Sequence, residues 1–314
     1  MANASGRMIF ARGTRRQGCG LVVLAAALLA AFAAALVFLG AVGAPRGAGE
    51  HGGAGGDLPQ LRSDYVVLED AGGATIAERG AHERMRPASM TKMMTALVAI
   101  ERIGVLDAPA TVMSGDFAGL YEANASLAGF EPGERTTVRE LVYGALLPSG
   151  AECCQALARI AAGTTDDFVD LMNERAAELG MADTHFRNTT GLDEDGHYST
   201  AADMATLLRA ALDNEDFRAA FTSVRHAVPP TNRHPDGFTL RSTLSESLGS
   251  YEVPGGWIIG GKTGYTAGAG LCLASAAEID GELYVLVTAH APGAQDSGRH
   301  ARDAVAAYSW LARR

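Results

Sequence analysis

Two residues, Ser89 and Lys92, have the types and the spacing of an activated nucleophile and its base. They lie in the stretch "RPASMTKMMTALVAIE", whose apolar spacing predicts a helix that opens at Ser89. Side chains three residues apart share one face of a helix, so the Lys92 amine can reach the Ser89 hydroxyl and take its proton. The pair predicts a serine nucleophile with a lysine as general base.

A lysine is unusual at this position. The start of a helix carries a partial positive charge, and a capping box would place Glu where Lys92 stands. Of the 26 Lys and Arg residues in the chain, two are lysines, Lys92 and Lys262. An arginine stays protonated, whereas burial near a helix start lowers the pKa of a lysine and yields a neutral amine. The presence of lysine rather than arginine at position 92 therefore indicates that this side chain acts as a base.

The second lysine lies in the glycine-rich stretch "GGKTGYT", residues 260–266. Its glycines let a ligand approach the backbone of a strand closely. Lys262 and Thr263 offer a charge and a hydroxyl group to a carboxylate. The stretch predicts an anion-binding strand, and its combination with an upstream S-x-x-K pair is far more specific than either motif alone.

The elements that must position these residues are strands at both ends of a mostly helical region. "YVVLED" and "ATIAER" flank a Gly-rich turn and predict a hairpin. Strands return from about Gly255, and a final helix is expected from about Asp296 to Leu311. The helices between them are indicated by "TTVRELVYGALL", "AECCQALARIAA", "TDDFVDLMNERAAELG" and "TAADMATLLRAALDN". We predict an α+β domain in which the N-terminal hairpin and the C-terminal strands form one antiparallel sheet, with the helical insert packed on it.

The N-terminal part predicts attachment to a membrane. Residues 1–20 form a basic tail, and residues 21–42 are uncharged and would span about 33 Å as a helix, enough for a bilayer core. The preceding arginines predict a cytoplasmic N-terminus and an extracytoplasmic domain. A signal cleaved near Gly43 or Ala44, which would give a secreted protein, is the alternative. Residues 43–60 are a Gly-rich tether, and residues 61–314 the catalytic domain.

Composition excludes several classes of function. The formal net charge of −10 disfavours nucleic acid as a partner, and because Arg7, Arg12, Arg15 and Arg16 lie in the tail, the remainder of the chain is more acidic still. Four cysteines do not form a disulfide framework, and Cys153, Cys154 and Cys272 are expected to be small buried residues. The histidines show no H-E-x-x-H pattern, so neither a metal nor another cofactor is expected.

The chain resembles the serine-type D-alanyl-D-alanine carboxypeptidases, which are low-molecular-mass penicillin-binding proteins, over roughly residues 64–312. The resemblance rests on four stretches in the family's order: "RPASMTKMMTALVAIE", "LLPSG", "THFRNTTGLDEDGHYSTAADMA" and "GKTGYTAGAGLCLASA". It implies an acyl-enzyme on Ser89, Lys92 as base, and a proton relay through Ser149. The substrate would be a peptidoglycan stem peptide ending in D-Ala-D-Ala, and β-lactams would be covalent inhibitors.

The resemblance also implies a substrate-binding set. Lys262 and Thr263 would hold the terminal carboxylate. Gly264 would allow close approach of the substrate. The backbone N–H groups of Ser89 and Tyr265 would form the oxyanion hole.

One motif departs from the family. Its middle motif is S-x-N, whereas this chain has Ser149, Gly150 and Ala151, so the amide that would contact Lys92 and the substrate is missing. Ser149 and Glu152 also have the S-x-x-E spacing of a capping box, with Glu152 as a first-turn acid. A hydroxyl group can accept a capping hydrogen bond and still donate its proton, so Ser149 can serve both purposes.

Two other functions stay open at this stage. A class A-like β-lactamase shares S-x-x-K and K-T-G, but its deacylating glutamate, followed shortly by Leu-Asn, does not occur between Ser149 and Lys262. A cell-wall binding module with impaired turnover is suggested by Ala151. In the turn-rich segment around His185, Asn188, Gly191 and His197, the polar groups are expected to brace a loop near the cleft.

Overall fold

The computed structural model describes residues 58–314. The predicted basic tail, the apolar span at 21–42 and nearly all of the tether fall outside these residues. Within residues 58–314, no helix combines the length and the apolar character that crossing a membrane requires.

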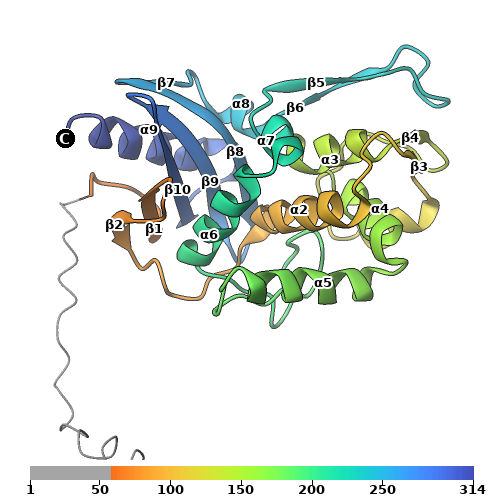
Figure 1. Ribbon diagram of the computed structural model, residues 1–314, viewed down its shortest axis with the longest axis horizontal. Helices are drawn as coiled ribbons and strands as arrows, with labels where there is room; N and C mark the ends of the chain where they lie inside the picture. Colours follow the sequence, from red (N-terminus) through yellow and green to blue (C-terminus); the bar gives the residue numbers. More distant parts are fainter. Residues whose placement is uncertain (1–57) are drawn as a thin grey trace, which may run out of the picture. The chain divides into compact units, whose positions relative to one another are not determined.

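The central element is a six-stranded antiparallel sheet with the strand order β2-β1-β10-β9-β8-β7 (Figure 1). Its strands are β1 (Tyr65–Asp70), β2 (Thr75–Arg79), β7 (Glu252–Val253), β8 (Gly256–Thr266), β9 (Gly270–Ile279) and β10 (Glu282–Ala291). Tyr65 pairs with Ala289, and Asp70 pairs with Tyr284. The predicted closure of the N-terminal hairpin on the C-terminal strands is therefore confirmed.

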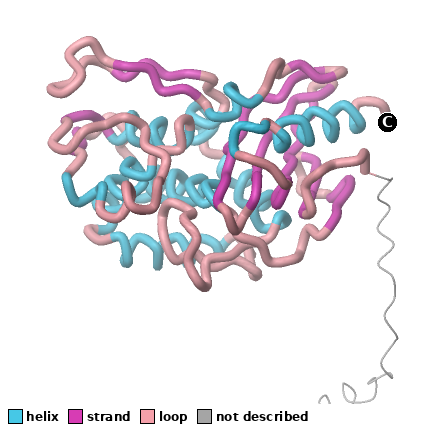
Figure 2. The backbone as a smooth tube through the Cα atoms, turned by 180° about the vertical axis from the view of Figure 1, so that it is seen from behind, coloured by secondary structure: helices cyan, strands magenta, loops and turns pink. Residues whose placement is uncertain are grey.

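Both faces of the sheet are covered, which explains the apolar run in β1. Val66 and Leu68 pack in one core with Tyr308 of the last helix, α9 (Arg299–Leu311), whereas Val67 points into the larger core with the other helices. A strand buried on both faces shows no alternation of polar and apolar residues. Figure 2, which views the molecule from behind, shows α9 in front of the strands.

The helical part packs on the opposite face of the sheet around α2 (Thr91–Ile103), which is buried from Thr91 to Ile100. Its other helices are α3 (Val138–Leu146), α4 (Ala151–Ala162), α5 (Thr165–Glu178), α6 (Ala201–Leu212) and α7 (Glu215–Phe221). Helix α6 confirms the helix predicted for "TAADMATLLRAALDN", and the first residue of this stretch caps it, because Thr200 Oγ1 accepts a hydrogen bond of 3.0 Å from the Asp203 N–H.

Several short elements were not predicted. They are the 3₁₀ turns η1 (Ala88–Met90), η2 (Ser114–Phe117) and η3 (Gln295–Ser297), the strand pairs β3 (Pro109–Thr111) with β4 (Arg135–Thr137) and β5 (Arg225–Val228) with β6 (Phe238–Arg241), and the helices α7 and α8 (Thr243–Ser247). The predicted start of the last helix near Asp296 falls in η3, and α9 itself begins at Arg299.

The interior contains the three cysteines that the sequence assigned to it, together with three methionines of the S-x-x-K region. Cys153, Cys154 and Cys272 are fully buried and free, which confirms the expectation that they act as small apolar residues. Met90, Met93 and Met94 are fully buried as well. All six residues belong to the larger of the two cores.

Candidate active site

Ser89 lies in the 3₁₀ turn η1, directly before α2, and the backbone around it is tightly enclosed. Ala88 has a φ of +46°, a conformation that alanine rarely adopts. A Cβ atom added to Gly191 would lie 1.8 Å from the Ala88 carbonyl oxygen, and one added to Gly264 would lie 3.0 Å from the Ser89 nitrogen. The two glycines therefore allow two other segments to hold the serine from both sides.

Lys92 reaches Ser89, as the spacing of the two residues predicts. Its Nζ donates a hydrogen bond of 2.9 Å to Ser89 Oγ, and its side chain is 3% exposed. Burial lowers the pKa of Lys92. No acidic residue lies in the first turn of α2. A buried amine with a lowered pKa, in contact with a hydroxyl group, has the geometry of a general base.

Ser149 and Lys262 form a second buried pair. Lys262 is fully buried, and its Nζ donates hydrogen bonds of 2.9 Å to Ser149 Oγ and to the Thr263 carbonyl oxygen. Burial, followed by the like charge of Lys92, lowers the pKa of Lys262 well below its ordinary value. Because Ser149 Oγ accepts from Lys262, its own proton remains free for donation.

The predicted capping box at Ser149 is wrong. The N-cap of α4 is Gly150 and has no side-chain hydrogen bond, while Ser149 has a φ of +67° and directs its hydroxyl group to Lys262 instead. Glu152 is fully buried, and its Oε1 accepts hydrogen bonds from the N–H groups of Ala128 (2.6 Å) and Gly129 (3.1 Å). Burial raises the pKa of Glu152. This carboxyl group therefore anchors a neighbouring loop.

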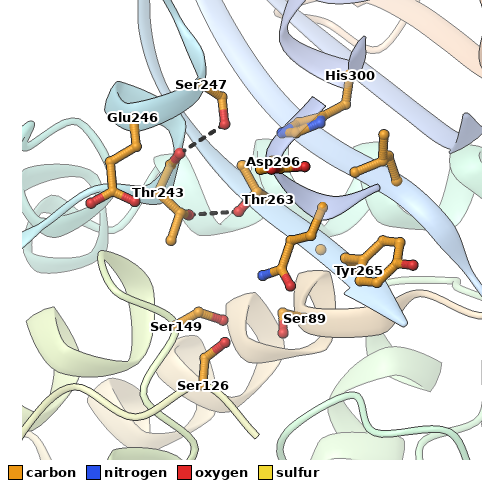
Figure 3. A pocket seen from close by; sticks show the side chains of 13 residues that line it. Ser89, Ser126, Ser149, Thr243, Glu246, Ser247, Thr263, Tyr265, Asp296 and His300 are labelled. Carbon is orange, nitrogen blue, oxygen red and sulfur yellow. Dashed lines mark hydrogen bonds between the residues drawn. The ribbon is translucent and has the colours of Figure 1, made fainter. Parts of the chain in front are cut away.

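A cavity of about 420 Å³ opens beside Ser89 (Figure 3). Ser89, Ser126 and Ser149 line it from the helical part, while Thr263 and Tyr265 line it from β8. Its remaining lining residues are Thr243, Glu246, Ser247, Gly264, Leu271, Gln295, Asp296 and His300. A second cavity, of about 380 Å³, contacts Ser89 and Lys92 and shares Ser126 and Tyr265. The nucleophile thus stands between two open spaces.

The substrate-binding residues expected on β8 are distributed between the cavity and its wall. Thr263, Gly264 and Tyr265 line the cavity, and Thr263 Oγ1 lies 2.5 Å from Thr243 Oγ1 at the start of α8. Lys262 does not line it and lies behind Ser149 and Thr263. Lys262 can therefore act on a ligand in this cavity through Thr263, Ser149 and its electrostatic field.

The turn-rich segment around residues 185–197 braces the nucleophile, as expected. Asn188 Oδ1 accepts from the N–H of Gly191 at 2.8 Å, which fixes the loop that meets Ala88. His197 Nδ1 accepts from the Arg187 N–H at 3.0 Å, so in the neutral ring Nε2 carries the hydrogen and donates to Thr91 Oγ1 at 2.9 Å. Burial lowers the pKa of His197 to about 4, which keeps it neutral at pH 7.

Two other histidines form hydrogen bonds with buried glutamates of the helical part. His226 contacts Glu140 at 2.7 Å, and His234 contacts Glu134 at 2.9 Å. Across residues 58–314, no group of three or more His, Cys, Asp or Glu side chains is placed to hold a metal ion.

The sequence did not identify Ser126, Thr243, Glu246 or His300 as lining the cavity. These residues lie in loops, in α8 and in α9, far along the chain from either lysine motif. No local pattern marks them, because only the packing of these separate segments in the folded domain brings them to the cavity.

Comparison with known proteins agrees with this geometry. The family model described as D-alanyl-D-alanine carboxypeptidase, peptidase family S11, matches residues 57–293. The chain belongs to this family. Its sequence is 36% identical to D-alanyl-D-alanine carboxypeptidase DacF of Bacillus subtilis over 226 residues, which cover 71% of this chain and 55% of DacF. The chain thus spans about half the length of that relative.

Two further members of the D-alanyl-D-alanine carboxypeptidase group have more similar lengths. DacB2 of Mycobacterium tuberculosis is 36% identical over 224 residues, covering 71% of this chain and 72% of DacB2. The crystal structure of the Streptomyces K15 DD-transpeptidase superposes with a TM-score of 0.72 at 27% identity, covering 82% of this chain and 100% of that chain. The α+β fold of the DD-peptidases is therefore established for the described residues.

Proposed function

We propose that this protein is a serine D,D-carboxypeptidase that removes the terminal D-Ala from peptidoglycan stem pentapeptides. The observation that carries the proposal is the buried Lys92 amine, 2.9 Å from the hydroxyl oxygen of Ser89, at the junction of two cavities. Membership of the D-alanyl-D-alanine carboxypeptidase family supports this substrate.

The first half of the reaction would form an acyl-enzyme. Ser89 Oγ attacks the carbonyl carbon of the penultimate D-Ala while its proton passes to Lys92 Nζ. The negative charge that develops on the carbonyl oxygen is met by the N–H groups of Ser89 and Tyr265. Ser149 then donates its proton to the departing amine and is reprotonated by the proton that Lys92 took from Ser89, so both lysines end this half in the state in which they began it. The peptide bond breaks and free D-Ala leaves.

The second half would return the free enzyme. A water molecule attacks the ester carbon and gives a proton to Lys92, and Ser89 regains its proton as the ester bond breaks. The product is a stem peptide shortened by one residue. Neither half requires a cofactor.

The proposal is tested by D-Ala release from a stem pentapeptide with the full chain and its Ser89→Ala variant. We expect release by the wild type and none by the variant, while both unfold at the same temperature. A folded wild type that releases no D-Ala would refute the proposal and favour the binding module.

Penicillin provides an independent test. The same hydroxyl group should open the β-lactam ring and form a stable ester on Ser89. We expect mass spectrometry to show one penicillin added to the wild type for many minutes, and none added to Ser89→Ala. An adduct that disappears within seconds would instead indicate a β-lactamase.

We also propose that residues 21–42 anchor the protein in the cell membrane, with the D,D-peptidase domain outside it. Support comes from the uncharged stretch and the preceding arginines. Fractionation should find the full chain in the membrane, and an added protease should reach the domain only from the outer side. A mature protein that begins near Gly43 would show cleavage instead.

A further inference from the structure

The cavity beside Ser89 contains a buried imidazole, His300, that the proposed mechanism does not use. His300 lies in the first turn of α9 and lines the same cavity as Thr243 and Thr263 (Figure 3). Its side chain is 3% exposed, and both ring nitrogens are buried without a hydrogen-bond partner. Leaving a buried polar atom unpaired costs free energy. A ligand that enters the cavity could supply the missing partner.

The charges around the cavity indicate the kind of ligand. Glu246 of α8 and Asp296 of η3 are its charged lining residues, and both are exposed acids. Lys262 does not line the cavity, and its amine is already bonded to Ser149 and Thr263. Among the lining residues, His300 is therefore the one basic side chain available to a substrate that ends in a carboxylate.

We propose that His300 donates a hydrogen bond to the terminal carboxylate of the substrate, an inference that rests on the proposed carboxypeptidase function. The carboxylate would sit between the Thr263 hydroxyl group and the imidazole. Gln295 and Asp296, which line the entrance beside His300, are exposed, so their side chains can turn aside as the carboxylate enters.

The protonation state of His300 is compatible with this role. Burial lowers the pKa of His300 to about 4; the acid Asp303 opposes this effect and Arg302, on the same helix, adds to it. At pH 7 the empty site therefore holds a neutral ring with one N–H donor and one acceptor. A carboxylate at the donor would favour the protonated form and strengthen the contact.

The test compares two peptides that differ only at the C-terminus: one ends in the D-Ala carboxylate, the other in D-Ala amide. Release of D-Ala or D-Ala amide is measured with the full chain as wild type, His300→Leu and His300→Gln. We expect His300→Leu to lower kcat/KM for the carboxylate peptide about tenfold or more, and to change kcat/KM for the amide peptide less than about twofold. His300→Gln keeps an N–H donor and should recover part of the loss.

A purely structural role would lower both rates by the same factor in His300→Leu, and that result would overturn the inference. Suppose that the wild type cleaves the peptides but that both variants keep its ratio of kcat/KM between the carboxylate and the amide peptide. That result would refute the role of His300 and leave the proposed function standing. A wild type that cleaves neither peptide would refute the proposed function as well. Should His300→Leu fail to fold, His300→Met provides the apolar comparison.

Discussion

At the scale of single residues, the site depends on removing two lysine side chains from water. Lys92 and Lys262 are buried, and each donates to a serine hydroxyl group at 2.9 Å. Both pKa values are lowered mainly by burial. In the proposed reaction, desolvation therefore supplies the neutral amine that takes the Ser89 proton, and arginine could not replace lysine because it stays protonated.

The base role of Lys92 predicts a pH dependence. The base must be neutral, so the rate of acylation by penicillin should rise with pH and level off at an apparent pKa below the ordinary lysine value of about 10.4. Lys92→Arg should lower that rate by about a hundredfold or more. A stopped-flow or gel assay of acylation between pH 5 and 10 checks both statements. An undiminished rate in Lys92→Arg would exclude the amine as base.

Position 151 offers a test of the departure from the family motif. Ala151 is fully buried beside Ser149, and its N–H donates to the Ser126 carbonyl oxygen at 2.8 Å. Ala151→Asn should add one polar contact in the site. Such a contact contributes about 1 kcal/mol, so the rate of D-Ala release should rise severalfold. Turnover equal to that of the wild type, with unchanged thermal stability, would show that the alanine is neutral.

At the scale of elements, the nucleophile turn is positioned by two neighbouring segments rather than by its own helix alone. The loop at Gly191 contacts the carbonyl group of Ala88, and β8 contacts the Ser89 nitrogen at Gly264. The loop is itself fixed by Asn188. Accurate placement of Ser89 therefore depends on a loop that carries no catalytic group.

Gly191 tests this dependence. Gly191→Ala combines a φ of +82° with a Cβ atom 1.8 Å from the Ala88 carbonyl oxygen, so the turn must move. Gly180→Ala is the matched control, since Gly180 has a φ of +77° and nothing within 4 Å. We expect the control to lose about 1 kcal/mol of stability through backbone strain and to keep its acylation rate. Gly191→Ala should lose more stability than the control, and its rate of acylation by penicillin should fall at least about tenfold. Equal stability and equal acylation rates in the two variants would contradict the role of the loop.

The sequence was sufficient for the elements with strong local signals. Periodicity and the types of a few residues are enough to predict the hairpin at 65–79, the helix that begins after Thr200 and the contact within the S-x-x-K pair. All three are present in the structure. The partner of Ser149 could not be predicted, because its hydroxyl group had a plausible local use as a cap. Contact with Lys262, more than a hundred positions away, outweighs that use. His300 has no local signal, since its place in the cavity depends on how α9 packs.

At the scale of the whole molecule, two buried histidines couple folding to pH. The pKa of His197 and of His300 is about 4 in the folded state, against about 6.5 in an unfolded chain. The unfolded state therefore binds more protons between these values, and stability decreases as the pH falls from about 6.5 to about 4. Each histidine contributes up to about 3 kcal/mol to this loss.

Chemical unfolding at pH 7.0, 5.5 and 4.5 checks the coupling. Relative to the wild type, His300→Leu should lose less stability between pH 7.0 and 4.5, because it lacks one of the two groups. His82→Gln, which changes an exposed histidine, should follow the wild type. Identical pH slopes for all three proteins would show that His300 is not protonated on unfolding.

The position of β1 between β2 and β10 has a consequence for how the protein is made. β1 can pair at once with β2, which follows it in the chain, but its pairing of residues 65–70 with residues 284–289 forms only when nearly the whole domain has been synthesised. Until then the sheet cannot close, and the growing polypeptide stays open. Delayed closure is compatible with the extracytoplasmic location that we propose, because a chain whose sheet is not yet closed can still cross a membrane in an extended form.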